Sequence, residues 1–196
     1  YGPKANDLAI QVLGGAGYTR EYPIEQCYRD NRLNPIHEGT YGIQSLDLLG
    51  RKLWQHNGKG LSLLMQRIQK TLSEIQDHNL AGLAETFKKH LATVQKTTQV
   101  LGQALHQGRV DAALANSGLY LDMMGKTIIA WLWLEMANQA QLKFASSDYA
   151  EDQQFLTGKM QAAQYFIRWE LPEVEHQAQL LMNFDDTCLN MQPEWF

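Results

Sequence analysis

Apolar residues recur along this chain at intervals of three and four positions, which is the spacing of a helix that buries one face. Between residues 61 and 75 the stripe consists of Leu61, Leu64, Met65, Ile68, Leu72 and Ile75. A second stripe runs from Leu80 to Leu105. No stretch of useful length alternates apolar and polar residues as a half-buried strand would. The pattern predicts an all-α protein built as a helical bundle.

Three short helices are expected in the N-terminal part. Each is followed by residues that end helices: glycine tolerates the left-handed conformation of a helix end, and the residue before proline avoids helical angles. The expected segments are 4–13, 23–32 and about 40–56, ended by Gly14-Gly15, Asn34-Pro35 and Asn57-Gly58. Pro23 suits the first turn of the second helix.

Longer helices are expected beyond this point. Besides the two apolar stripes, a helix capped by Asp111 should run to Phe144, because an aspartate side chain accepts bonds from the first free amides. Gly118 and Gly125 could allow neighbouring helices to approach it closely. After a break at residues 146–148, a further helix should run to Leu171, where Pro172 either kinks it or starts a new segment.

The division between these parts is placed near residues 57–60. Residues 1–57 contain the candidate chemistry, and residues 58–196 read as an up-and-down helical extension without a motif of its own. The sequence thus predicts two domains, 1–57 and 58–196.

Composition and charge limit the function classes. The chain has 196 residues, of which 44% are hydrophobic and 19% charged, and this is an ordinary globular balance. The net charge of −4 argues against a nucleic-acid partner, because no basic excess offsets phosphate. Cys27 and Cys188 form no disulfide framework and are interpreted as free thiols.

No segment of the sequence predicts membrane insertion. The most apolar run, residues 128–134, is far shorter than the roughly 20 residues that a spanning helix needs. No secretory signal opens the chain, so a cytoplasmic location is expected. The sequence begins without a methionine and enters a helical pattern at once, so we interpret it as the C-terminal piece of a longer protein.

Glu38 is the first candidate catalytic residue. It stands between Pro35 and a Gly-Thr pair that can start a helix. A carboxylate at that position favourably opposes the positive end of the helix dipole, and on spacing alone this structural role is favoured. The alternative is a general base, since a carboxylate in a partly dry cleft can abstract a proton.

The glycines after the first helix have two interpretations as well. A Gly-Gly pair at a helix end is usually only a cap. The Gly-x-Gly pattern of residues 15–17 follows a helix and not a strand, so it lacks the context of a dinucleotide-binding fold. Glycines without side chains can also let a phosphate approach the backbone closely.

Four motifs, in order and at matching separations, resemble the acyl-CoA dehydrogenase family. They are residues 11–18 (Gln-Val-Leu-Gly-Gly-Ala-Gly-Tyr), residues 21–23 (Glu-Tyr-Pro), Arg29-Asp30, and residues 38–40 (Glu-Gly-Thr) followed by Ile43-Gln44. They cover the C-terminal half of that family's last all-α domain. Residues 46–52 and the long helical tail resemble a subgroup with an additional C-terminal helical domain, which includes enzymes acting on methylthiopropionyl-CoA.

The resemblance implies a reaction and a cofactor. In the family, a glutamate at the position of Glu38 removes the α-proton of an acyl-CoA thioester, and the β-hydrogen leaves as hydride to FAD, giving a trans-2-enoyl-CoA. The protein must polarise the thioester carbonyl and exclude water, and the flavin supplies the redox chemistry.

Further site residues are carried over from the resemblance. Contacts to the FAD diphosphate, often that of a neighbouring subunit, are implied for Gln11, Val12, Leu13, Gly14 and Gly15. Gly39 would lie beside the thioester. A second FAD contact, at a helix N-terminus that suits anions, is implied for Thr40, Tyr41 and Gly42. No metal ligand is expected, because His37-Glu38 has no second histidine four residues on.

Three positions depart from the family pattern. His37 stands where many relatives have tyrosine, Tyr41 where the subgroup often has asparagine, and Gly42 where many relatives have glutamine or glutamate. Arg29 and Asp30 are interpreted as a local ion pair that holds the turn.

Two functional hypotheses follow. The first is the C-terminal part of an acyl-CoA dehydrogenase, inactive alone because the rest of the pocket would come from other domains. Its partners would be an acyl-CoA substrate, further copies of the chain, and an electron-transfer flavoprotein, the family's usual electron acceptor. The alternative is a structural helical module that serves oligomerisation or covers the active site, without catalysis of its own.

Overall fold

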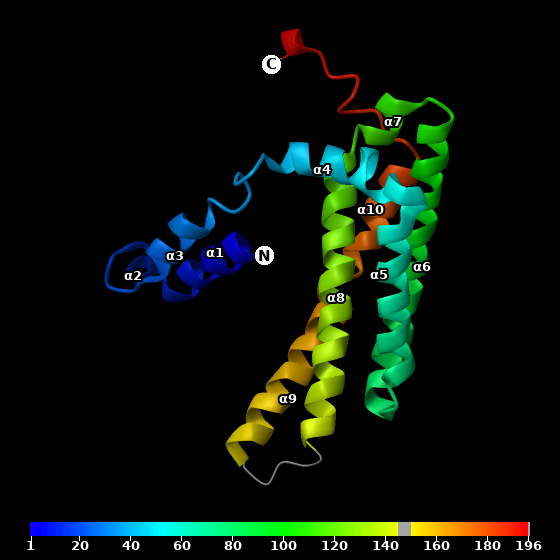
Figure 1. Cartoon of the computed structure of the whole chain (residues 1–196). Helices are drawn as coiled ribbons and strands as arrows, with labels where there is room; N and C mark the ends of the chain where they lie inside the picture. Colours follow the sequence, from blue (N-terminus) through cyan, green and yellow to red (C-terminus); the bar gives the residue numbers. More distant parts are fainter. Residues whose placement is uncertain (145–149, 196) are drawn as a thin grey trace. The chain divides into compact units, whose positions relative to one another are not determined.

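The regular elements of this protein are all helical, as the sequence predicted (Figure 1). The computed structural model describes residues 1–144 and 150–195, and within these ranges no residue belongs to a strand. The chain divides into two compact units, Tyr1–Gln44 and Ser45–Phe196. The division falls inside one helix, α4 (Tyr41–Gly50).

The first unit is a small helical hairpin. Its elements are α1 (Gly2–Leu13), the single turn α2 (Gly15–Tyr18), α3 (Ile24–Asn31) and the first residues of α4. Helices α1 and α3 pack against each other, and the Asn6 side-chain amide donates to the carbonyl of Cys27 at 3.0 Å. The expected ends at Gly14 and before Pro35 are confirmed, because α1 stops at Leu13 and α3 at Asn31.

Gly17 shows why the turn between α1 and α3 needs glycine. It is the one buried residue of α2. A Cβ added there would lie 2.8 Å from the carbonyl oxygen of Ile10 and 2.9 Å from Cβ of Leu13. Both distances are shorter than van der Waals contact, so any side chain at residue 17 would force α2 away from α1.

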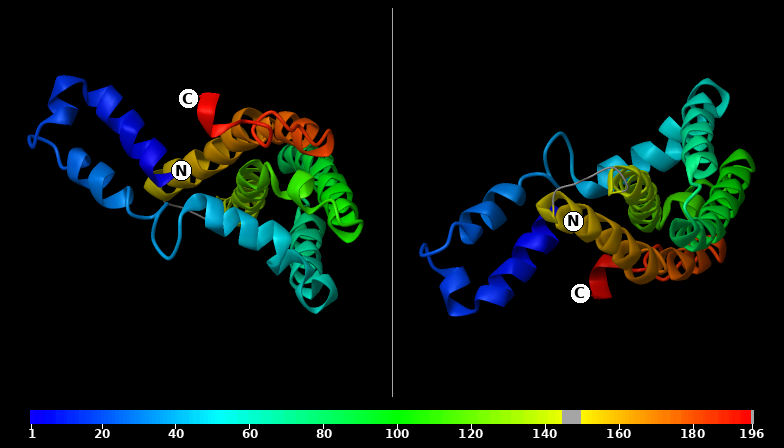
Figure 2. Two further views of the ribbon diagram at one scale, coloured as in Figure 1. Left: turned by 90° about the horizontal axis from the view of Figure 1, so that it is seen from above. Right: turned by 90° about the horizontal axis from the view of Figure 1, so that it is seen from below.

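The second unit is a bundle of long helices. Figures 1 and 2 show α5, α6 and α8 running side by side, with α10 against α6 and α8, and α9 returning along α8. Its elements are η1 (Lys52–Trp54), α5 (Gln55–Glu74), α6 (His78–His106), α7 (Val110–Leu114), α8 (Ser117–Phe144), α9 (Ala150–Tyr165), the π-helical η2 (Phe166–Glu170), α10 (Glu173–Met182) and η3 (Pro193–Trp195).

The core of the second unit consists of the predicted apolar stripes. Phe87 and Ile68 are fully buried, and the largest fully buried side chains also come from α4, α8, η2 and α10. Leu49 of α4 belongs to this same core. Burial of such side chains is worth roughly 1.5–3 kcal/mol each, so the bundle is stabilised by its own residues.

Polar side chains connect the helices across this core. Each pair joins residues far apart in the sequence: Ser45 Oγ to Ser117 Oγ (3.0 Å), Trp131 Nε1 to Thr71 Oγ1 (2.8 Å), Thr98 Oγ1 to Tyr120 OH (2.8 Å) and His90 Nδ1 to Glu175 Oε1 (2.7 Å). A buried group left without a partner is costly, so these pairs favour one arrangement of α4, α5, α6, α8 and α10.

The prediction of one helix from Asp111 to Phe144 is wrong. The chain forms a short α7 (Val110–Leu114) and a separate α8 that starts at Ser117. Asp111 lies within the first turn of α7 and is not its cap, a place held by Arg109. At the break, the Asn116 side chain donates to the carbonyl of Asp185 (2.7 Å), and the main-chain carbonyl of Asn116 accepts from the amide of Leu119 (3.0 Å).

The helix expected to end near residue 56 has a different boundary. Helix α4 ends at Gly50. His56, Asn57 and Gly58 then adopt three consecutive left-handed conformations, with φ of 50°, 57° and 74°. Such angles cost an ordinary residue roughly 1–2 kcal/mol, and only asparagine and glycine adopt them readily. The sequence thus predicted a break at the right residues but not its left-handed form.

Other expectations have mixed outcomes. Pro172 starts a new segment, since α10 follows it directly. Gly125 does not bring helices together, because a Cβ there would meet nothing within 4 Å. The break predicted at residues 146–148 lies outside the described residues. Both cysteines are free, and the described helices include none long and apolar enough to cross a membrane. The domain boundary at residue 57 stays a prediction.

Candidate active site

Glu38 lies in a strained position at the entrance to α4. Its φ is +57°, although it has a side chain. Non-glycine residues held in this region cost about 1–3 kcal/mol and concentrate at functional sites. The Glu38 side chain is 83% exposed. Within the first unit the carboxylate is therefore open to solvent.

Gln44 holds this strained backbone in place. Its side-chain Nε2 donates to the main-chain carbonyl of Glu38 at 2.8 Å, one helical turn into α4. Gly39, with φ of +124°, follows the carboxylate, and a Cβ at this glycine would lie 3.0 Å from Nε2 of Gln44. Glycine is required here both for the backbone angle and for the space that the Gln44 amide occupies.

Thr40, Tyr41 and Gly42 form the start of α4. The carbonyl of Thr40 accepts the first bond of the helix, from the amide of Gln44 at 3.1 Å. A Cβ at Gly42 would meet nothing within 4 Å, so the backbone here can be approached closely. The expected helix start near Thr40 is confirmed.

His37 is the only ionisable side chain that an ion-pair contact joins to Glu38 among the described residues. Its Nε2 lies 3.9 Å from Oε1 of Glu38, and the His37 side chain is 67% exposed. Exposed pairs at this distance contribute little to stability. The imidazole is nevertheless close enough to interact electrostatically with the carboxylate once water is excluded, because Coulomb interactions strengthen as the local dielectric constant falls.

The predicted phosphate-binding turn lies at the end of α1. Gly14 has φ of +58°, which a side chain would disfavour, and its amide donates to the carbonyl of Gln11 at 3.2 Å. Gly15 is exposed, and a Cβ there would meet nothing within 4 Å. Gln11 and Val12 are exposed too, and Leu13 is half-buried. The turn therefore offers open backbone to a ligand.

A cleft beside this turn contains three arginines. It has a volume of about 740 Å³ within the first unit, and its lining includes Arg20, Arg29 and Arg32. The carboxylates of Asp7 and Glu25 line it too, and Glu25 pairs with Arg29, so Arg20 and Arg32 are the cations left to face a ligand. Guanidinium groups recognise phosphates and stack on aromatic rings. Sequence reasoning missed Arg20 and Arg32, because their clustering depends on the packing of α1 on α3.

The predicted Arg29-Asp30 ion pair is wrong. Arg29 Nη1 instead pairs with Oε2 of Glu25 at 2.8 Å, and Asp30 accepts a hydrogen bond from Gln26 at 2.8 Å. Adjacent residues on a helix point in different directions, whereas residues four apart lie on one face. No group of three or more histidine, cysteine, aspartate or glutamate side chains within residues 1–144 and 150–195 could hold a metal ion.

Two family models together match most of the chain. The model described as "Acyl-CoA dehydrogenase, C-terminal domain" matches residues 3–53, which include Glu38 and the glycine turn. The model described as "Acetyl-CoA dehydrogenase C-terminal like" matches residues 64–192. The chain therefore belongs to the acyl-CoA dehydrogenase family, and the resemblance seen in its motifs is confirmed.

Curated relatives agree with this assignment. The broad-specificity linear acyl-CoA dehydrogenase FadE5 of Mycobacterium tuberculosis is 27% identical over 194 residues, 96% of this chain and 32% of the relative. The 3-methylmercaptopropionyl-CoA dehydrogenase of Ruegeria pomeroyi is 29% identical over 188 residues, 93% of this chain and 31% of the relative. This chain thus spans about a third of the length of these relatives.

A shorter match with a higher percentage identity is confined to a small part of the chain. The mitochondrial short-chain specific acyl-CoA dehydrogenase of Rattus norvegicus is 53% identical over 45 residues, which is 23% of this chain. Identity within the family is therefore distributed unevenly along the sequence.

Proposed function

We propose that this chain is the C-terminal part of an FAD-dependent acyl-CoA dehydrogenase, with Glu38 as the base that removes the α-proton of an acyl-CoA thioester. The product would be a trans-2-enoyl-CoA. The observation that carries the proposal is the left-handed Glu38 fixed by Gln44, within the segment that matches the family's C-terminal domain.

The local geometry suits a base that must be positioned without its own cleft. The bond from Gln44 Nε2 to the Glu38 carbonyl fixes the direction in which the side chain leaves the backbone. In this role Gly39 lies beside the thioester through its backbone, because the Gln44 amide fills the space where a side chain of residue 39 would stand. A correctly placed base contributes about 10²–10⁴-fold to rate. The walls that keep water away would come from parts of the enzyme beyond these residues.

The residues present fit a dinucleotide cofactor. The open backbone at Gly15 and the arginines of the neighbouring cleft suit a diphosphate, and Gly42 offers a second open approach at α4. FAD, when bound, would accept the β-hydrogen as hydride. In this role Gln11, Val12, Leu13, Gly14 and Gly15 contact the diphosphate, and Thr40, Tyr41 and Gly42 make the second contact. The acceptor after FAD would be an electron-transfer flavoprotein.

The first test is the Glu38→Gln variant of the complete enzyme. We expect kcat/KM with an acyl-CoA to fall by about 10²–10⁴-fold, because glutamine cannot accept the proton. Glu38→Asp, with a shorter side chain, should retain more activity than Glu38→Gln. Unchanged flavin absorbance would show that both variants remain assembled. Full activity of the Glu38→Gln enzyme with every acyl-CoA would refute the assignment.

The second test uses the 196-residue chain itself. It should not reduce a dye with any acyl-CoA, because one carboxylate without a closed pocket is not an active site. Titration with FAD, followed by quenching of flavin fluorescence, tests the glycine turn. Gly15→Val should weaken any saturable binding, since a side chain there meets the ligand and not the chain's own atoms. Quenching unchanged by Gly15→Val would rule out contact at this turn.

A structural role for the second unit has its own supporting observation. Phe155, Tyr165 and Trp169 are 63%, 54% and 72% exposed. Large exposed apolar side chains mark contact surfaces. We infer that this unit supports a homo-oligomer. Phe155→Glu and Trp169→Glu should dissociate the oligomer in light scattering while the subunits stay folded, because these positions contribute little to the core. An unchanged mass of the oligomer in light scattering would contradict the inference.

A further inference from the structure

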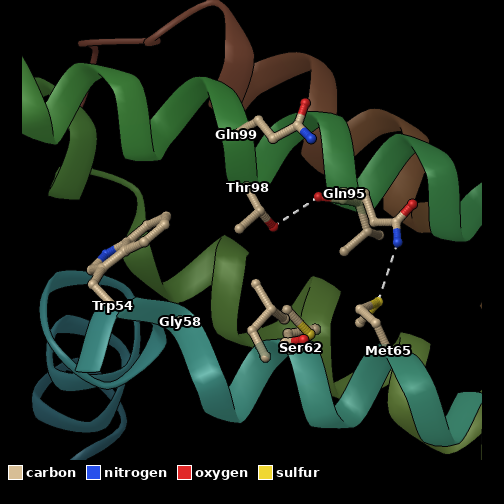
Figure 3. Close-up of a pocket in the computed structure, with 10 residues that line it drawn as sticks. Trp54, Gly58, Ser62, Met65, Gln95, Thr98 and Gln99 are labelled. Atoms are coloured by element: carbon tan, nitrogen blue, oxygen red, sulfur yellow. Dashed lines mark hydrogen bonds between the residues drawn. The ribbon is translucent and has the colours of Figure 1, made fainter. Parts of the chain in front are cut away.

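The second unit contains a cavity that the desaturation reaction does not use. It has a volume of about 470 Å³ and lies between α5 and α6, with Met124 of α8 contributing to its lining. Figure 3 shows Trp54 at one end of the cavity and Met65 at the other. Small-molecule sites typically have volumes of about 300–1,000 Å³. A cavity of this size is too small to admit a helix about 10 Å across.

The walls are shaped by a glycine. A Cβ at Gly102 of α6 would lie 2.4 Å from Cη2 of Trp54, so only glycine lets the outer edge of the indole approach α6 this closely. The indole is also held by a hydrogen bond from its Nε1 to the carbonyl of Leu49 at 2.6 Å. Gly58, the last residue of the left-handed turn, completes the wall at this end. The cavity is thus a built feature and not a gap in loose packing.

The lining selects against charge. Apolar surface comes from Trp54, Leu61, Met65, Val94 and Met124. Among the described residues that line the cavity, none is an aspartate, glutamate, lysine, arginine or histidine. Ser62, Gln95 and Gln99 of the lining are exposed to water, whereas its apolar residues would cost a charged ligand hydration without offering it a partner. The two methionines can adapt to different apolar shapes, because their thioether side chains are flexible.

One polar group is positioned to recognise a ligand. The Nε2 of Gln95 donates to the sulfur of Met65 at 3.2 Å (Figure 3). A thioether is a weak acceptor, so a ligand oxygen that replaced it would gain a stronger bond. Ser62 and Gln99 add a hydroxyl and an amide to the same lining.

We propose that this cavity binds an uncharged amphiphile, with an aliphatic or aromatic body against Trp54, Met65 and Met124 and an alcohol or carbonyl oxygen bonded to Gln95. Nothing in this binding requires Glu38 or the glycine turn. The site would therefore remain if the proposed dehydrogenase chemistry were wrong.

The test follows methionine methyl groups by NMR in the 196-residue chain, with 1-octanol as the probe. The chain has seven methionines. Met65 and Met124 line this cavity, whereas Met136 lines a separate one of about 550 Å³ between α8 and α9. Saturable shifts of Met65 and Met124, with Met136 unmoved, are expected. Equal shifts at all three would mean nonspecific partitioning and would overturn the proposal.

Octanoate, an anion of the same chain length, tests the neutrality of the site. We expect it to bind at least tenfold more weakly than 1-octanol at pH 7. Equal affinity would contradict the assignment of an uncharged ligand. Shifts of Met65 that depend on protein concentration without octanol would show that a second copy occupies the cavity, and this too would overturn the proposal.

Variants test the position of the ligand. Ser62→Phe places a ring over the cavity and should abolish the octanol shifts, whereas Leu63→Phe, on the opposite and exposed face of α5, should leave them unchanged. Gln95→Leu keeps the bulk but removes the donor, and should weaken binding five- to tenfold. Retention of full affinity by both Ser62→Phe and Gln95→Leu would place the ligand elsewhere.

Discussion

The two units of this chain differ in how much of their stability they supply themselves. In the first unit Gly17 is the only buried residue, and large apolar side chains such as Leu8, Val12 and Ile36 are exposed. In the second unit a continuous core extends from Leu49 to Leu181. The unit that holds the family's motifs is therefore the one least able to bury its own apolar surface.

The difference shows how a catalytic segment and a scaffold divide their tasks. Exposed apolar residues in the first unit suit contact with further protein or a cofactor, whereas the second unit satisfies its hydrophobic and polar groups internally. Three pairs of variants and one pH experiment can break or sharpen this comparison.

The largest effect is expected from truncating the core of the second unit. Phe87 is fully buried, so Phe87→Ala should lower the free energy of unfolding by about 3–5 kcal/mol. Val12, whose side chain is 86% exposed, is the matched position in the first unit. Val12→Ala should change the free energy of unfolding by less than about 0.5 kcal/mol. Urea unfolding followed by circular dichroism measures both. Similar losses would mean that the first unit is buried in solution.

Alkaline pH should selectively weaken the second unit. Burial raises the pKa of Tyr120 to about 12, although a hydrogen bond with Thr98 lowers it slightly. The folded state thus retains a proton that the unfolded state loses near pH 10, so this stability is present below pH 10 and is lost as pH rises to 12. The loss should be about 2–3 kcal/mol.

Tyr120→Phe is the control for this pH dependence. The ring remains buried, but no ionisable hydroxyl is left, so unfolding free energies of the variant should fall less between pH 10 and 12. Lys126 is present in both proteins: burial lowers its pKa, but bonds to Asp122 and Glu173 raise the pKa overall, so its contribution cancels when the two profiles are compared. If the unfolding free energies of the two proteins fell in parallel with pH, Tyr120 would not be the source of the lost stability.

Two glycines of α6 should respond in opposite directions. Gly102→Ala must displace the Trp54 indole and should cost about 1–3 kcal/mol, as other overpacked sites do. At Gly82, by contrast, a Cβ meets nothing within 4 Å, and Gly82→Ala should gain about 0.5–1 kcal/mol from helix propensity. Thermal unfolding and tryptophan fluorescence measure both variants. A stabilised Gly102→Ala protein would contradict the packing described for Trp54.

The smallest effect is expected at the left-handed turn. His56 has φ of +50° without the local bonding that helps asparagine, so His56→Gly should raise stability by about 0.5 kcal/mol. Asn57→Gly should change it less. A clear loss of stability in His56→Gly would show that the imidazole makes a contact that offsets its strained backbone.

The sequence predicted the fold through its strongest patterns. The stripes from Leu61 to Ile75 and from Leu80 to Leu105 are helices in the structure, because a repeat of three and four residues is compatible with few other arrangements. The break at Asn116 was missed, and the bond that the Asn116 side chain makes there joins it to Asp185, 69 residues away, which no local pattern indicates. The close packing assigned to Gly125 occurs instead at Gly102, where only the position of Trp54 decides it.

The candidate site was predictable as residues but not as geometry. Glu38, Gly39 and the glycine turn were identified from motif order, and whether they act as proposed stays a prediction. The left-handed angle of Glu38 and its bond from Gln44 were not predictable, because no local rule requires a glutamate to adopt φ of +57°. The grouping of Arg20 with Arg32 likewise depends on tertiary packing.

The pairing of α6 with α10 has a consequence for synthesis on the ribosome. His90 and Thr93 of α6 contact Glu175 of α10, and His90 precedes it by 85 residues. At typical elongation rates this separation corresponds to roughly 4 to 17 seconds of translation. During that interval the face of α6 that carries His90 has no α10 to pack against, so this part of the bundle can close only after α10 has left the exit tunnel.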